Sequence, residues 1–483
     1  MVRLLIHLHR VLGTLFSVLF LVWFLSGFVM IYHHFPYLGS QEYKQLPSLP
    51  DSLPPVNGIH RVIPDSLVVE SLSVQMFRGK PVFRVETSAR DFLLAADSSL
   101  RVVEEGVPFH EVSEYARQWC AADIRSVDTL RCLDQWIPYS NLKSDFPIYR
   151  FSFADEQETI LYISSVTGRA LQCVTREQRV WAWLGPIPHM LYFWQLRQHR
   201  AQWVSLVSWL AGIGALMCLA GMVIGVRSYV LAYRRRKRFI SPYKKFFFKW
   251  HHVLGFVFGF FVFMFALSGL MSVNDLPQWM VRTHNTAMAS RLRESPSIDL
   301  SAFTADYRRV VQQHKGEVKE ISFNQYGAKP YYSVVLNGAV QNFDASQPEP
   351  KPLYLSQQDV LNRLSTVCDA PKTISLMTEF DSYYVGFTKR MELPVYKVIA
   401  SNPDQSVFYV NPNTGRTRYF NRNLRAGKWI YPAFHSLRFK FFAEHRVLRD
   451  VVLWILLIGG TLVSFTGVVL GLKYIVRLAT RRR

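Results

Sequence analysis

Residues 8–13 read LHRVLG and residues 250–255 read WHHVLG, and each phrase opens a long apolar run. The agreement extends well beyond the phrase itself. The positions that match at this spacing of 242 residues are His9, Val11, Leu12, Gly13, Ser26 and Gly27, which fall on His251, Val253, Leu254, Gly255, Ser268 and Gly269. Self-similarity at a fixed spacing indicates two copies of one structural unit. The two apolar runs are therefore predicted to be equivalent segments of a repeat.

A second pair of segments matches at a spacing of 246 residues. Residues 183–200 read WLGPIPHMLYFWQLRQHR, and residues 429–446 read WIYPAFHSLRFKFFAEHR. The shared positions are Trp183, Pro186, His189, Phe193, His199, Arg200, Gly214, Gly221 and Gly225, which fall on Trp429, Pro432, His435, Phe439, His445, Arg446, Gly460, Gly467 and Gly471. Each half of the chain therefore repeats the same order of apolar run, polar segment and apolar run.

Four runs are nearly free of charge and long enough to cross a membrane as helices, since a bilayer core of about 30 Å needs about 20 helical residues. The runs are Val11–Tyr32, Ser205–Val226, Phe256–Val273 and Val451–Leu472. Four crossings place both termini on one side. Both halves then enter the membrane from the same side, so the repeats are predicted to be parallel, with equivalent residues at equal depth.

The positive charge indicates the orientation. The short loop after the second run, the C-terminal tail and Arg3 and Arg10 together hold 16 of the 56 Lys and Arg residues and no acidic residue. The remaining 40 basic residues face 35 acidic ones, so the net charge of +21 mostly reflects topology. The positive-inside rule places the loop, the tail and both termini in the cytoplasm.

We expect no nucleic-acid binding, because the basic loop is too short to fold. We interpret the first run as a retained anchor because no signal-peptide cleavage site follows it.

The long polar segments are predicted to be α+β. Residues 149–169 and 396–416 each show two alternating runs separated by a turn and followed by Thr-Gly-Arg, which is typical of a β-hairpin. Helical patterns precede them at 109–124 and 356–368. The five cysteines form no C-x-x-C motif, which argues against a zinc ribbon and covalently attached haem. Whether Cys120 and Cys132 form a disulfide is left open.

The helix followed by a hairpin with a TGR turn, the His-x-x-x-Gly openings and the Trp-x5-His segments together resemble the PepSY-associated transmembrane proteins of the bacterial inner membrane, which are linked to iron uptake. The resemblance implies four transmembrane helices in two parallel repeats with two α+β PepSY-like periplasmic domains. The predicted parts are helix 1 (1–34), periplasmic domain 1 (35–182), the second helix with its preceding segment (183–228), a cytoplasmic loop (229–249), helix 3 (250–274), periplasmic domain 2 (275–428), the fourth helix with its preceding segment (429–475) and a cytoplasmic tail (476–483).

The histidines fall into two layers. Ten of the 14 lie at or next to the ends of the predicted spans. His9 and His251 lie at equal depth on the cytoplasmic side, and His199 and His445 lie at equal depth on the outer side. A b-type haem between two helices needs one imidazole on each face of its iron, so these two pairs are the predicted ligands of two haem irons.

Other histidines remain as alternatives. His189 and His435 are repeated as well, and can replace the outer pair or line a substrate access route. His252, His33 and His34 lack a histidine at the equivalent position and can substitute as ligands. Any one of these residues can instead be an interfacial histidine that hydrogen-bonds lipid headgroups or neighbouring carbonyls. Ionisable groups repeated at membrane depth favour a function.

The branch of the family that the chain resembles reduces ferric siderophores. We therefore expect a haem-containing reductase that passes electrons to a periplasmic ferric siderophore or other ferric chelate and releases ferrous iron. No nucleotide-binding motif is present, so the electron donor is expected to be separate, either a membrane quinol or a cytosolic flavoprotein. Aromatic residues near the outer span ends form an interfacial belt or line a groove for the chelate. The competing hypothesis is a non-enzymatic PepSY scaffold that binds or regulates a transporter or protease.

Overall fold

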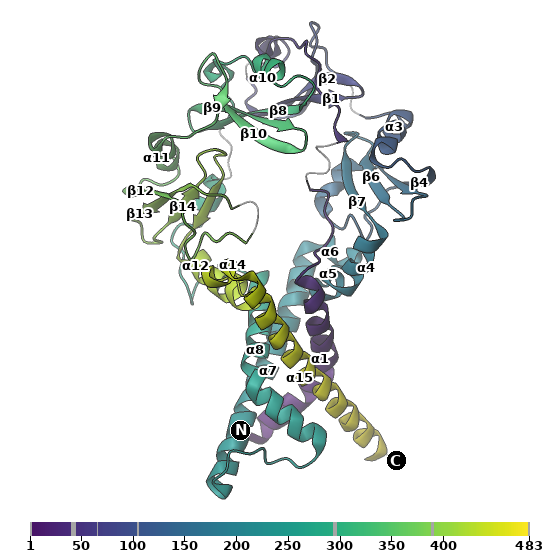
Figure 1. Ribbon diagram of the computed structural model, residues 1–483, viewed down its shortest axis with the longest axis vertical. Coiled ribbons are helices and arrows are strands. Elements are labelled where there is room, and N and C mark those ends of the chain that lie inside the picture. The colour runs from purple at the N-terminus through teal and green to yellow at the C-terminus, as the bar shows by residue number, and fades with distance from the viewer. Residues whose placement is uncertain are drawn as a thin grey trace.

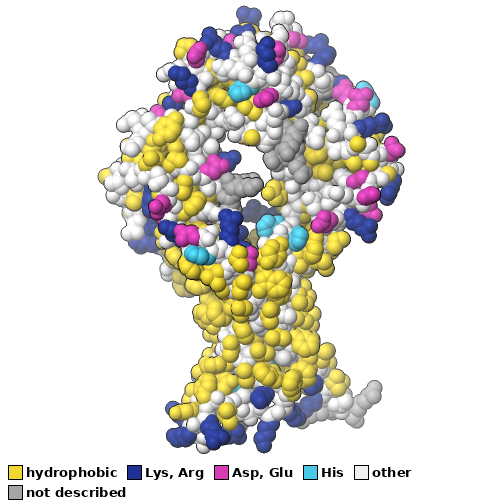
Figure 2. Space-filling view, in the orientation of Figure 1, with side chains coloured by type: hydrophobic (Ala, Val, Ile, Leu, Met, Phe, Trp, Pro, Cys, Tyr) yellow, Lys and Arg dark blue, Asp and Glu magenta, His cyan; other side chains and the backbone are white. Residues whose placement is uncertain are grey.

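The computed structural model describes residues 2–39, 45–64, 66–103, 106–292, 297–387 and 391–481. Four long helices form a stalk, and three β-sheets form an arch on one end of it (Figure 1). Both chain termini lie at the other end (Figure 1). We call this the basic end, because Lys and Arg side chains gather there (Figure 2), and we call the opposite end of the stalk helices the sheet end.

The stalk helices correspond to the four predicted spans. They are α1 (Val2–Met30), α7 (Arg200–Arg236), α8 (Phe246–Ser272) and α15 (Arg446–Arg481). α1 packs along α7 and α15, and α8 packs along the same two helices. All four are long and apolar enough to cross a bilayer, and hydrophobic side chains cover the middle of the stalk (Figure 2). The chain is therefore a multi-pass membrane protein, as its apolar runs predict.

The arch contains three antiparallel sheets. Their strand orders are β4-β5-β6-β7, β12-β13-β14-β15 and β11-β10-β9-β8-β1-β2-β3. The strands are β1 (Val69–Phe77), β2 (Lys80–Thr87), β3 (Asp91–Ala95), β4 (Ile124–Leu130), β5 (Ile148–Phe153), β6 (Ile160–Ser164), β7 (Ala170–Val174), β8 (Val318–Tyr326), β9 (Lys329–Leu336), β10 (Ala339–Asp344), β11 (Lys351–Pro352), β12 (Lys372–Met377), β13 (Val395–Ala400), β14 (Val407–Val410) and β15 (Thr417–Phe420).

The predicted hairpins and helices are confirmed. β5 pairs with β6 and β13 pairs with β14, and the TGR turns place Gly168 and Gly415 at φ values of +69° and +66°. Glycine adopts this left-handed conformation without strain. The predicted helical segments form α3 (Phe109–Trp119) and α11 (Gln357–Ser365). α11 begins with a capping box in which Ser356 and Asp359 each accept a hydrogen bond from the other's backbone amide.

The seven-stranded sheet was not expected, because it combines strands from both halves of the chain. β1 of the first polar segment pairs with β8 of the second, with Leu72 opposite Phe323 and Gln75 opposite Glu320. An unpaired β1 and an unpaired β8 would each leave a sheet edge exposed, and their pairing removes both edges. One large core on one face of this sheet contains buried residues of both halves, including Phe83. The two outer segments therefore meet at the top of the arch (Figure 1).

Short helices connect the arch to the stalk. In the first half they are α4 (Arg176–Leu184), α5 (Pro186–Met190) and α6 (Trp194–Arg197), and in the second they are α12 (Arg422–Lys428), the π-helical turn η4 (Trp429–Ala433), α13 (Phe434–Ser436) and α14 (Lys440–Glu444). The remaining short helices are η1 (Val56–Arg61), η2 (Ser140–Asp145), α9 (Met288–Arg291), η3 (Leu300–Ala302) and α10 (Tyr307–Gln313). α5 packs against α1, and α13 packs against α8. These contacts bring the connecting segments down to the bundle.

Candidate functional site: two histidine pairs in the stalk

The first pair lies toward the basic end of the stalk. His9 on α1 faces His251 on α8, and their ring centroids are 6.2 Å apart, with an angle of 40° between the planes. The pairing that the repeat predicts is therefore present in the structure. Both histidines come from the phrase that opens each apolar run.

One ring nitrogen of each histidine in this first pair is anchored. Nδ1–H of His9 donates to the backbone carbonyl of Met217 on α7 at 3.0 Å. Nδ1 of His251 is 2.9 Å from the hydroxyl of Thr466 on α15, and that hydroxyl donates in turn to the α15 backbone. A neutral imidazole that donates from Nδ1 presents an unprotonated Nε2. Within the described part of the chain, neither Nε2 atom has a hydrogen-bond partner, so both lone pairs are free for a ligand.

A glycine makes room for the His9 ring. A Cβ atom added to Gly221 on α7 would lie 2.5 Å from Cε1 of His9, well inside van der Waals contact. At the equivalent position on α15, a Cβ on Gly467 would lie 3.6 Å from Cε1 of His251. Gly221 is therefore required by the position of the His9 ring, whereas Gly467 tolerates a small side chain.

The second pair lies at the sheet end. His189 on α5 and His435 on α13 have ring centroids 6.2 Å apart, with an angle of 71° between the planes. Both rings lie against stalk helices, because Nδ1 of His189 contacts Ser26 on α1 and Nδ1 of His435 contacts Ser268 on α8. The structure thus brings together the two histidines that the sequence offered as alternatives for the outer layer.

Two serines fix these outer rings. Ser26 donates its hydroxyl proton to the α1 backbone at 2.7 Å and Ser268 donates to the α8 backbone at 2.6 Å, so each oxygen is left to accept. Nδ1–H of His189 donates to Ser26 and to the carbonyl of Trp23, both at 3.1 Å. Nδ1–H of His435 donates to Ser268 at 2.9 Å. The repeated Ser-Gly phrase therefore orients the outer histidines, a role that the sequence did not reveal.

The ring spacing of both pairs would suit two imidazoles that hold one metal-centred group between them. A metal–imidazole bond of about 2.0 Å on each side of one ion would hold two rings facing each other across a gap of this order. Both observed separations are 6.2 Å. The described residues include no group of three or more His, Cys, Asp or Glu side chains that could hold a metal ion. A histidine pair supplies two ligands, and haem, whose porphyrin supplies the other four, would complete the coordination of an iron held there.

The separation of the two pairs along the stalk is close to the thickness of a bilayer core. His9 and Ser26, which contacts the outer pair, are 17 residues apart on α1. This corresponds to about 25 Å of helix, against a bilayer core of about 30 Å. The two pairs therefore lie toward opposite faces of the apolar layer.

His199 and His445, the outer ligands that the sequence put forward, lie apart from this arrangement. Both are exposed and stand directly before α7 and α15. His445 donates from Nδ1 to the carbonyl of Phe441 and stacks on the Phe441 ring at 4.6 Å. Among the described residues, His199 has no ring contact with another histidine. These positions resemble the interfacial alternative more than a ligand pair.

The remaining alternatives are also placed. His252 is buried, and both of its ring nitrogens are engaged, Nδ1 with Ser241 and Nε2 with the carbonyl of Gly225. It therefore fixes the loop between α7 and α8 and leaves His251 as the ligand candidate on α8. His33 stacks on Trp181 at 4.2 Å, and His34 is exposed.

The cysteines form no bridge in this structure. All five are free, including Cys120 and Cys132. Cys120 instead packs beside Cys173 at the edge of the same hydrophobic core, which is lined by Phe151 and Leu161. Burial raises the pKa of the Cys173 thiol to about 11, with a smaller contribution from Cys120.

These features define a multi-pass membrane protein with a β-sheet arch and with two histidine pairs at different depths in its helical stalk. Residues 6–470 match the family described as the PepSY-associated TM region. The match covers almost the whole chain, so the protein belongs to this family. No curated protein matches the sequence.

Proposed function

We propose that the protein binds two b-type haems and passes electrons across the membrane to a ferric siderophore or other ferric chelate, which then releases ferrous iron. The observation that carries this proposal is the pair of matching histidine sites, each with centroids 6.2 Å apart and each with Nε2 atoms that have no hydrogen-bond partner among the described residues. Two independent sites with the same separation and the same anchored nitrogen favour ligation over interfacial packing.

The residues would divide the work as follows. His9 and His251 hold one iron, and His189 and His435 hold the other in place of His199 and His445. Bound there, haem iron supplies one-electron steps between its ferric and ferrous states. Met217, Thr466, Ser26 and Ser268 orient the rings from behind, and such outer contacts also increase the basicity of a histidine ligand. The apolar stalk excludes water from both sites.

The orientation follows from charge. We propose that the basic end is cytoplasmic and that the arch is periplasmic, in the bacterial inner membrane, because the basic residues lie at the end with both termini. The donor is then a quinol or a cytosolic flavoprotein that reaches the His9–His251 pair. Equivalent contacts at Ser26 and Ser268 support a parallel repeat across the two halves.

A haem count on histidine variants tests this function. Protein expressed with ample haem should contain two haems per chain in a pyridine haemochrome assay. His9→Ala and His189→Ala should each retain one. His199→Ala and His445→Ala are matched controls that should retain both. A colourless wild-type protein would overturn the proposal and favour the scaffold hypothesis.

A further inference from the structure

A basic cavity opens beside the outer histidine pair. Its volume is about 540 Å³, within the range of roughly 300–1,000 Å³ that small-molecule sites occupy. It lies where the end of α8 meets α12 and η4, and its wall includes residues 271–276, Asn423, Tyr431 and Pro432. The cavity is therefore at the junction of the stalk and the arch.

The charge of this cavity is strongly one-sided. Among the residues that the structure describes, its lining contains Arg200, Arg418, Lys428 and Arg438 but a single carboxylate, Asp275. Among the described residues, the three arginine side chains make no ion pair. Arg200, Arg418 and Arg438 are also solvent-exposed, so their guanidinium groups are accessible to a ligand. A concave surface with three to four cations and one anion attracts anionic groups.

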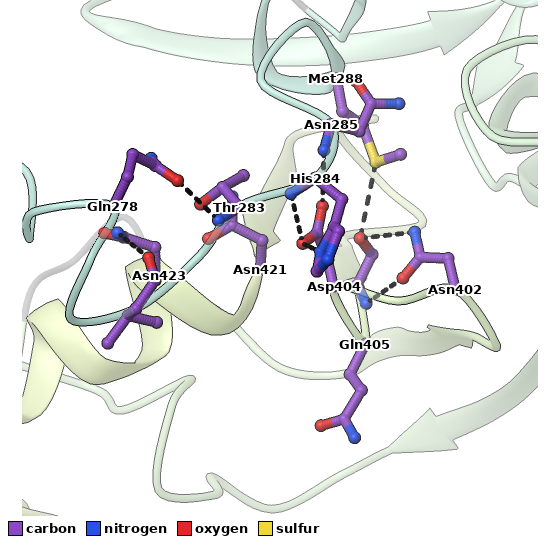
Figure 3. Close-up of polar contacts among 12 residues, drawn as sticks. Gln278, Thr283, His284, Asn285, Met288, Asn402, Asp404, Gln405, Asn421 and Asn423 are labelled. Carbon is purple, nitrogen blue, oxygen red and sulfur yellow. Dashed lines mark hydrogen bonds and ion pairs between the residues drawn. The ribbon is translucent and has the colours of Figure 1, made fainter.

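The wall of the cavity is held by a polar network (Figure 3). The Asn423 side chain donates to the carbonyls of Leu276 and Val281, both at 2.9 Å. Buried Asp404 accepts from the backbone amide of His284 at 2.8 Å and from its Nδ1–H at 2.9 Å. These bonds fix the segment after α8 against the second half of the arch. The cavity is thus largely formed before any ligand binds.

The cavity reaches the outer histidine pair through one aromatic ring. Tyr431 lines the cavity, and its ring centroid is 5.3 Å from that of His435. Any molecule that contacts Tyr431 from the cavity is therefore one side chain away from the proposed outer ligand. This places a binding site next to the point where electrons would leave the stalk.

We propose that this cavity binds the chelate as an anion, through carboxylate or other negatively charged oxygen groups that contact Arg418 and Arg438. The inference rests on the proposed function for the identity of its ligand, and it adds a site and a charge selectivity. Neutral and cationic chelates bind less tightly, because they lose the attraction to the basic lining.

Binding of a redox-inert probe tests the site separately from electron transfer. Gallium(III) dicitrate carries net negative charge and gallium(III) desferrioxamine B carries net positive charge, and gallium is not reduced. Calorimetry on the full chain in non-ionic detergent should show binding of the dicitrate complex. The double variant Arg418→Gln/Arg438→Gln should weaken it about 30-fold, which corresponds to about 2 kcal/mol. The desferrioxamine complex should bind at least tenfold more weakly than the dicitrate.

Two controls make the result decisive. Arg416→Gln removes an exposed charge two residues before Arg418 but outside the cavity lining, and should leave the affinity unchanged. Equal affinity for both gallium complexes, or equal loss in the control, would overturn the proposal. An anionic phospholipid headgroup has similar chemistry. If phosphatidylglycerol nanodiscs abolish dicitrate binding while phosphatidylcholine nanodiscs preserve it, the cavity is a lipid site and the proposal fails. A protein that binds dicitrate but no haem would refute the reductase function alone.

Discussion

Substitution of Gly221 by alanine should remove one haem while leaving the fold intact. The added Cβ would lie 2.5 Å from Cε1 of His9, whereas ordinary van der Waals contact begins at 3.4 Å. The ring must therefore move by about 0.9 Å, which is the difference between these two distances. Metal–ligand distances in real sites agree within about 0.2 Å, so a shift of this size breaks the bond or changes its geometry. Alanine in place of glycine also favours the helix, so α7 should still form.

The assay compares three glycine variants. Gly221→Ala should lower the haem content from two per chain to one, or replace the low-spin spectrum of one haem by a high-spin one. Gly225→Ala lies on the same helix, and apart from the local helix backbone and chain neighbours no atom of the described residues lies within 4 Å of its new Cβ, so it should retain two low-spin haems. Gly467→Ala should be mild, since its nearest contacts are 3.3 Å and 3.6 Å. Two unperturbed haems in Gly221→Ala would refute the ligand role of His9.

Three further predictions test the surroundings of the sites. Ser268→Ala removes the acceptor of His435 Nδ1–H. It should weaken outer haem binding about tenfold, or lower the basicity of the histidine ligand, which is measured as a shifted reduction potential. Ser272→Ala, whose hydroxyl donates to the backbone of Gly269, should change neither quantity. Burial lowers the pKa of Lys428 to about 8, with Asp381 opposing and Arg418 reinforcing the shift, so its charge is lost as pH rises through 8. Gallium dicitrate affinity should therefore fall between pH 7 and pH 9 in calorimetry, and Lys428→Arg should abolish that part of the fall. Asp404→Ala leaves three donors unpaired and should destabilise the arch by about 3 kcal/mol, lowering its thermal midpoint by about 6 °C, while exposed Asp369→Ala should change neither.

The stalk could be predicted from sequence because its signals are local. A run of about 20 apolar residues can hardly form anything except a membrane helix, and the repeated phrase identified His9 and His251 as partners. The hairpins were equally accessible, since alternation and the TGR turn lie within about 20 residues. The seven-stranded sheet shared by the two halves could not be predicted from local sequence in this way. Leu72 pairs with Phe323, which lies 251 residues further along the chain, and no local pattern encodes that register.

The outer histidine pair could not be identified from the sequence repeat alone. His189 and His199 both recur at a spacing of 246 residues, so the repeat alone cannot choose between them. If the segment continued upward as one helix, His199 would be nearest to the stalk and His189 about 15 Å above it. The backbone instead reverses, because Leu191 and its counterpart Leu437 adopt left-handed φ values of 54° and 52°.

This reversal determines which histidines lie against the stalk helices. Leucine seldom adopts the left-handed region, so no sequence signal marks the turn, and an observed departure of this kind points to a functional constraint. It ends α5 one residue after His189 and α13 one residue after His435, so both rings stay against Ser26 and Ser268. Leu191→Gly should therefore preserve or favour the turn and retain both haems. Leu191→Val disfavours the turn and should lose the outer haem alone, as counted by pyridine haemochrome. Loss of the His9–His251 haem in that variant would contradict the separation of the two sites.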